Sequence, residues 1–200
     1  MYVVFIQFLR LGGDIPHFPV ALLLANVTWS FFTEATNMGM VSIVTRGDLL
    51  RKLNFSKHII VLSAICGAAI NFFINLIVVL LFSVFNGVQF TWTVIFAVPL
   101  FVELFLLATG VALILATLFV RFRDLGQIWE VVLQAGMYAT PIIYSLSMIH
   151  NKTVISLMLL NPLATIIQDL RHLLIYSGNQ TIGDFVTDKW VIAIPYILPF

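Results

Sequence analysis

The stretch Thr45–His58, TRGDLLRKLNFSKH, is the densest cluster of charge in the sequence and separates two long apolar segments. Its basic residues are Arg46, Arg51, Lys52 and Lys57. A short basic loop between two segments of membrane length indicates on which side of a bilayer the loop lies. Such a loop also offers a soluble partner a charged surface at the membrane.

The composition is that of a membrane protein. Of the 200 residues, 61% are hydrophobic and 10% are charged, and the mean hydropathy is +1.07. Soluble domains contain about 25% charged residues, so we expect an all-α polytopic membrane protein. The net charge of +1 does not suggest a nucleic-acid partner. The single cysteine, Cys66, lies in an apolar run and cannot build a disulfide framework or a metal cluster within one chain.

The gaps between charged residues predict four complete spans in a single transmembrane domain. These are Phe18–Val44, Ile59–Phe85, Thr91–Val120 and Gln127–Ile149. Each is longer than the roughly 20 residues that a spanning helix needs. The apolar segments 1–9 and 190–200 are shorter than that. We therefore expect a native protein that is longer at both ends and crosses the membrane six times.

The distribution of positive charge predicts the orientation. With six spans, the basic loop at Thr45–His58 and the loop Arg121–Gly126 lie on the same side. The basic residues on the opposite side are spread over a longer stretch of chain and mixed with aspartates. The positive-inside rule places the two basic loops in the cytoplasm.

A further helix is predicted after the fourth span, with Asn161 as N-cap, Pro162 at the first helical position and Gly178 as the stop. Its apolar face consists of Leu163, Ile166, Ile167, Leu170 and Leu174, and Gln168, Asp169, Arg171 and His172 are expected off that face. The pattern favours an interfacial or re-entrant helix within an outer region at about 147–178. Pro141 is expected to kink the span that precedes this region.

Each cytoplasmic loop has two interpretations. The segment at about 46–53 is either an ordinary positive loop or a transverse helix that docks into a cytoplasmic ATPase. Its residues are Arg46, Asp48, Leu49, Leu50, Arg51, Lys52 and Leu53. In the second loop, Asp124 has capping-box spacing to Gln127. Arg121 and Arg123 suit anionic headgroups, so a structural role is favoured there.

Two polar stripes cross the predicted spans. One contains Ser63, Gly67, Asn71 and Asn75, and the other contains Asn26, Ser30, Glu34 and Asn37. Small and polar residues in lipid face protein or water, so each stripe is a packing seam or the lining of a pore. Glu34 and Glu103 are ionisable groups at membrane depth, and each is either buried in packing or exposed to a transport path.

The aromatic residues are also ambiguous. Trp29, Phe31, Phe32, Tyr138 and Tyr144 could stack on sugar rings, although interface belts and lipid-facing packing explain most such residues. The sequence contains no HExxH motif, no paired acidic motif and no cysteine–histidine set, so metal catalysis has no support. It also lacks a GxxxxGK[ST] phosphate loop, so any ATP that drives the protein would bind a separate chain.

Several ordered motifs carry a family resemblance. These are WSFFTEAT at 29–36, SIVTRGDLLRKLNFSKHII at 42–60, ATGVALILATLFVRFRDLGQIWEVVLQ at 108–134, YATPIIYS at 138–145 and LNPLATIIQDLR at 160–171. Together they resemble the permease subunits of type-2 ABC exporters, most of all those that export teichoic acids, O-antigens and similar lipid-linked polysaccharides. One departure is Ser56, which follows Phe55 where the family usually has a proline.

The resemblance implies a six-span permease in the bacterial cytoplasmic membrane that forms a homodimer around a conduit. Two copies of a separate ATP-binding subunit would hold ATP and magnesium, so this chain would bind no cofactor and catalyse no covalent step. The coupling helix would lie at about Arg46–Leu53, and outer re-entrant helices at about Ser147–Tyr176. The candidates for the conduit lining are Trp29, Phe32, Glu34, Asn71, Asn75, Tyr138 and Tyr144.

Three alternatives remain. A related ABC exporter of drugs or lipids would share this architecture. An ion-coupled flippase would use Glu34 or Glu103 as a proton site, although six spans are few for that class and no inverted repeat is evident. A membrane-embedded transferase is disfavoured because the acidic and histidine motifs that it needs are missing from the sequence.

Overall fold

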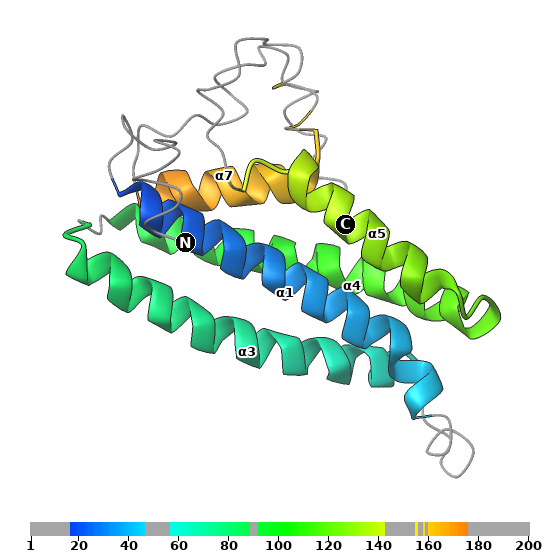
Figure 1. Cartoon of the computed structure of the whole chain (residues 1–200). Coiled ribbons are helices and arrows are strands. Elements are labelled where there is room, and N and C mark those ends of the chain that lie inside the picture. Colours follow the sequence, from blue (N-terminus) through cyan, green and yellow to red (C-terminus); the bar gives the residue numbers. More distant parts are fainter. Residues whose placement is uncertain are drawn as a thin grey trace.

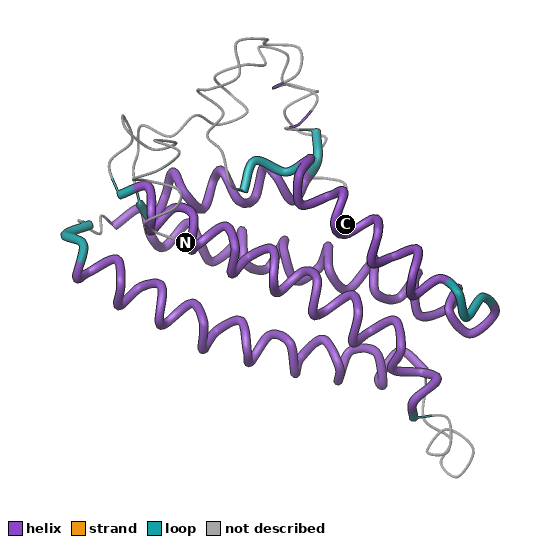
Figure 2. The backbone as a smooth tube through the Cα atoms, in the orientation of Figure 1, coloured by secondary structure: helices purple, strands orange, loops and turns teal. Residues whose placement is uncertain are grey.

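The computed structural model describes residues 17–46, 57–88, 92–142, 155, 158 and 160–175. Within these residues all regular structure is helical, which confirms the all-α prediction (Figures 1 and 2). The elements are α1 (Phe18–Thr45), α3 (Lys57–Phe85), the 3₁₀ helix η2 (Trp92–Phe96), α4 (Ala97–Arg121), α5 (Leu125–Ala139) and α7 (Pro162–Leu174).

Among the described residues, three helices are long and apolar enough to cross a membrane. They cover Phe18–Thr45, His58–Phe85 and Val94–Arg121, with 28 residues each. At 1.5 Å per residue each is about 42 Å long, more than the roughly 30 Å of a hydrocarbon core. Their ends lie within a few residues of the bounds expected from the charge gaps, because charged residues stop an apolar helix at the membrane surface.

Helix α1 is at the centre of the bundle. It packs against both α3 and α4, which also contact each other (Figure 1). Helix α5 folds back from the C-terminal end of α4 and contacts both α1 and α4. Helix α7 crosses the other end of the bundle, where it packs against α4, α1 and η2.

Small residues allow α1 and α4 to approach each other closely. Ala108, Ala112 and Ala116 of α4 are fully buried, as is Ala35 of α1. At Gly39 the approach is closest, because an added Cβ would lie 2.7 Å from the Ala112 Cβ. Association of helices in lipid depends on this kind of close van der Waals contact.

The substitution Gly39→Ala should loosen this seam. We expect the free energy of unfolding to fall by about 1–3 kcal/mol, because a Cβ at Gly39 overlaps Ala112 and the helices must shift. Gly110→Ala is the matched control, since an added Cβ there has nothing within 4 Å. The measurement is unfolding of the purified protein in detergent. Equal stability of the two variants would contradict the close approach.

Helix α5 ends earlier than the sequence suggested. It stops at Ala139, and Thr140 adopts an extended conformation with ψ 134°. The cause is Pro141, which disfavours helical geometry at the residue before it. The predicted span Gln127–Ile149 with a kink at Pro141 therefore differs from the structure, where the helix ends instead of bending. Residues 143–149 lie outside the described part of the chain.

Helix α7 begins as predicted. The Asn161 side chain accepts a hydrogen bond of 3.1 Å from the Leu163 N–H, which confirms the N-cap, and the helix ends at Leu174. The expected apolar face is buried throughout, at Leu163, Ile166, Ile167, Leu170 and Leu174. Gln168 and Arg171 were expected off that face but are also buried. Because α7 packs against α4, α1 and η2, more than one stripe of it is covered.

Arg171 is the main polar link between α7 and its neighbours. It is only 4% exposed. Its Nε donates to the carbonyl of Ala21 at 3.2 Å, and its two terminal nitrogens donate to the carbonyls of Pro141 at 2.9 Å and Ile142 at 2.6 Å. Burial lowers the pKa of the guanidinium to about 10, which leaves it protonated at neutral pH. One cation thus ties α7 to the first turn of α1 and to the chain after α5.

Replacing Arg171 by methionine should be costly. Arg171→Met keeps an apolar stem but removes all three hydrogen bonds, so we expect a loss of about 3 kcal/mol or more in the free energy of unfolding. Arg121→Met is the control, because Arg121 is exposed and most surface changes cost less than about 0.5 kcal/mol. Chemical unfolding in detergent measures both. A similar small effect of the two substitutions would show that the Arg171 bonds contribute little.

Candidate functional site

Outside the edge of α3 that borders α1, the exposed side chains of α3 and α4 are mostly apolar. On α3 the exposed side chains include Ile59, Leu62, Ile70, Phe73, Ile74, Ile77, Val78 and Leu81, and on α4 they include Val98, Val102 and Ile114. Lipid tails accept such surfaces without cost, because no hydrogen-bonding group loses a partner there. These faces therefore suit contact with lipid.

Helix α1 shows the opposite pattern. Its large apolar residues are mostly buried, with Leu23 and Met38 as exposed exceptions. The side that the bundle leaves uncovered carries a line of polar residues that we call the polar strip: Asn26, Ser30, Thr33, Glu34 and Asn37. Of these, Ser30 is exposed and the others are half-buried. In a membrane such a surface must meet water, protein or a polar substrate.

The α3 edge of the polar strip is joined to α1 by hydrogen bonds. The Asn71 side-chain amide donates to Oε1 of Glu34 at 2.6 Å. Nearer the basic loop, the Arg46 guanidinium donates to the Ser63 hydroxyl at 3.4 Å. Between them, an added Cβ at Gly67 has nothing within 4 Å. The predicted α3 stripe is therefore a polar border beside α1, without the close helix contact that a packing seam requires at Gly67.

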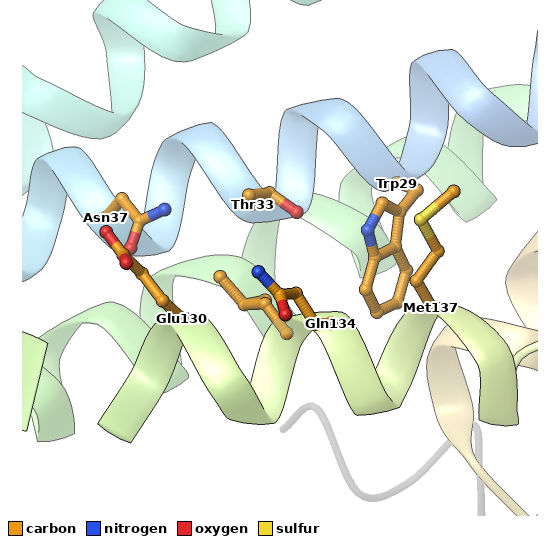
Figure 3. A pocket seen from close by; sticks show the side chains of 7 residues that line it. Trp29, Thr33, Asn37, Glu130, Gln134 and Met137 are labelled. Carbon is orange, nitrogen blue, oxygen red and sulfur yellow. The ribbon is translucent and has the colours of Figure 1, made fainter. Parts of the chain in front are cut away.

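The α5 edge of the polar strip contains a groove with a volume of about 230 Å³ (Figure 3). It is lined by Trp29, Thr33 and Asn37 of α1 and by Glu130, Leu133, Gln134 and Met137 of α5. In Figure 3, Asn37 lies beside Glu130, and Trp29 lies beside Met137. The Thr33 hydroxyl oxygen is buried and has no hydrogen-bond partner among the described residues.

Two contacts fix α5 beside the groove. The indole N–H of Trp129 donates to the Thr36 hydroxyl at 3.2 Å. A Cβ added at Gly136 would lie 3.0 Å from the ring of Trp29, so the glycine allows the α5 backbone to approach that ring. Trp29 and Phe32 are each only 8% exposed, and their ring centroids are 6.1 Å apart. These two rings offer little free surface for stacking on a sugar.

The structure distributes the predicted conduit residues over several surfaces. Glu34 lies in the polar strip and Asn71 at its α3 border, with Asn75 exposed one turn further along α3. Tyr138 is exposed on α5, and Tyr144 lies outside the described residues. Glu103 does not reach the polar strip: it is 7% exposed in the core of α4 and interacts electrostatically with Asp169 of α7.

The structure describes only part of the predicted cytoplasmic surface. Arg46 is exposed at the end of α1. The remaining residues of the predicted coupling helix, Asp48, Leu49, Leu50, Arg51, Lys52 and Leu53, lie outside the described residues. In the second loop Arg121, Arg123 and Asp124 are exposed. Asp124 occupies the N-cap of α5 but makes no side-chain capping bond, so the capping-box prediction is wrong.

Sequence reasoning missed several residues of the groove, namely Thr33, Glu130, Gln134 and Met137. A signal for them exists, because Trp29, Thr33 and Asn37 are spaced by four residues, as are Glu130 and Gln134. That spacing aligns side chains on one helix face. The spacing alone does not show that the two faces are turned toward each other.

Residues 2–175 match the ABC-2 type transporter family, and the chain therefore belongs to that family. Together with the three apolar helices this makes it a multi-pass membrane protein.

Curated relatives share one name. The O-antigen export system permease protein RfbA of Myxococcus xanthus is 34% identical over 156 residues, which cover 76% of this chain and 59% of that protein. Two proteins of the same name from Klebsiella pneumoniae are 26% and 25% identical over 174 residues, covering 86% of this chain and 67% of each relative. The chain thus spans about three fifths to two thirds of the length of these relatives.

Thiol labelling tests whether the polar strip meets water. In a Cys66→Ser background, Ser30→Cys and Asn37→Cys should react with a membrane-impermeant thiol reagent at least about tenfold faster than Ile74→Cys, because the reactive thiolate forms only in water. Ile74 is the control on the apolar face of α3. The measurement uses the full-length protein in native membranes. Equal labelling rates at the three positions would show that the polar strip is no more accessible to water than the apolar face of α3.

Proposed function

We propose that this chain is the membrane-spanning permease subunit of an ABC exporter that moves a lipid-linked polysaccharide across the bacterial cytoplasmic membrane. The observation that carries the proposal is the polar strip of α1, which is partly exposed in a bundle whose other exposed surface is largely apolar. The name of the relatives, O-antigen export system permease, supports a substrate of the O-antigen type.

The polar strip and its groove have the chemistry that such a substrate needs. Sugar rings carry many hydroxyl groups, and asparagine, glutamine, serine and threonine side chains exchange hydrogen bonds with them as donors and acceptors. A second copy of the subunit facing the strip would enclose it and separate the glycan from lipid. A homodimer therefore forms part of the proposal.

ATP would be hydrolysed by a separate subunit, because this sequence contains no phosphate loop. The segment at about 46–53 is the proposed contact with that subunit. Arg46 directly follows α1, and its backbone N–H bonds to the Ser42 carbonyl at the end of that helix. Since α1 is one continuous helix from Phe18 to Thr45, a push on the segment would be transmitted along it to the polar strip.

The test uses the full-length permease expressed together with its ATPase. Reversing charge by Arg46→Glu, Arg51→Glu and Lys52→Glu should reduce co-purification of the ATPase and ATP-dependent export at least about tenfold, since each contact between a basic residue and an acidic partner becomes repulsive. Lys152→Glu is the control, because Lys152 follows the predicted span Gln127–Ile149 and is therefore expected on the side opposite the two basic loops.

Unchanged assembly and export in the triple variant would contradict the coupling role of the segment. Export that survives ATP depletion and requires a proton gradient would contradict the ABC mechanism. That result would favour an ion-coupled flippase with Glu34, the ionisable residue of the polar strip, as its proton site.

A further inference from the structure

The charge along the described helices is one-sided. Away from the helix ends, where Lys57, His58 and Arg121 lie, the charged residues of α1, α3, α4 and α5 are Glu34, Glu103 and Glu130. Glu103 is buried in the core, whereas Glu34 lies in the polar strip and Glu130 lines the groove beside it. Among the described residues that form the polar strip itself and line its groove, the charged side chains, Glu34 and Glu130, are therefore both acidic.

The described basic residues do not counter these carboxylates. Arg46, Lys57, Arg121 and Arg123 lie at or just beyond the helix ends that are predicted to face the cytoplasm. Of these, Arg46 donates to the Ser63 hydroxyl at the border of the polar strip. The guanidinium of Arg171, on the predicted outer side, donates hydrogen bonds to three backbone carbonyls. Glu34 accepts a hydrogen bond from the neutral amide of Asn71, which does not neutralise its charge.

The neutral groups beside the carboxylates suit a hydroxyl-rich ligand. Asn37 and Gln134 carry amides on the two walls of the groove, and the buried Thr33 hydroxyl between them has no partner among the described residues. A sugar hydroxyl can donate to a carboxylate or an amide oxygen and accept from an amide N–H. A phosphate or carboxylate on a glycan can only accept, and it would be repelled by Glu34 and Glu130.

We infer that the polar strip and its groove select uncharged polysaccharide chains and discriminate against polyanionic ones, such as chains linked through phosphodiesters. This inference rests on the proposed function and specifies its substrate class. In the low dielectric of a membrane protein the repulsion between like charges is stronger than in water. A glycan with one negative charge per repeat would be repelled each time a repeat passes the two carboxylates. A second copy of the subunit would double the number of carboxylates.

The experiment measures ATP-dependent transport into inverted membrane vesicles that contain the full-length permease and its ATPase. Two lipid-linked glycans of equal length are compared, one neutral and one with a phosphate in each repeat. We expect the neutral glycan to be transported about tenfold faster or more. The double variant Glu34→Gln, Glu130→Gln should raise transport of the anionic glycan and reduce this ratio to about threefold or less.

Glu103→Gln is the matched control, because it makes the same chemical change at a buried position away from the polar strip. It should leave the ratio of the two rates unchanged. Equal transport of both glycans by the unmodified protein would overturn the inference while the proposed function stands. A ratio that the double variant does not alter would also overturn it. Absence of ATP-dependent transport of either glycan would instead contradict the proposed function itself.

Discussion

The hydrocarbon core of a lipid bilayer offers no hydrogen-bond partner to a polar group. The polar groups of this bundle must therefore find their partners within the protein or in water. The apolar spans form helices because a helix satisfies its own backbone N–H and C=O groups. Where α5 stops at Ala139, the chain leaves carbonyls that no helix can satisfy. Arg171 supplies the missing donors to Pro141 and Ile142. A buried arginine, which is costly when unpaired, therefore makes the break in α5 possible.

The same constraint explains why α1 has two different faces. Its buried side uses small residues such as Ala35 and Gly39, which bring α4 close. Thr28 and Thr36 are also fully buried there, and their hydroxyls bond to carbonyls one turn earlier in the same helix. Its uncovered side carries the polar strip, where such internal compensation is incomplete. A helix with its polar side turned outward is stable in a membrane only if something other than lipid covers that side.

Sequence patterns predicted features that depend on the chain locally. Charge gaps located the three long helices, because charged residues end an apolar run at the membrane surface. Asn161 was identifiable as a cap because it precedes Pro162 at a helix start. Features that depend on a neighbouring helix were not predictable. The burial of Arg171 follows from the packing of α7 against α1 and from its bonds to the chain after α5. The missing cap at Asp124 follows from backbone geometry that its spacing to Gln127 does not fix.

In the candidate site, too, local features were predictable from the sequence and contacts between helices were not. The line from Asn26 to Asn37 was visible as a polar stripe, but its pairing with Glu130 and Gln134 depends on how α5 lies against α1. That position is set by the bond from Trp129 to Thr36 and by the glycine at Gly136 that admits the Trp29 ring. Helix α1 forms one wall of the groove and continues to Arg46 at its C-terminal end, so a movement of that end would change the position of α1 relative to α5. Such a movement would alter the width of the groove, because α1 and α5 form its two walls.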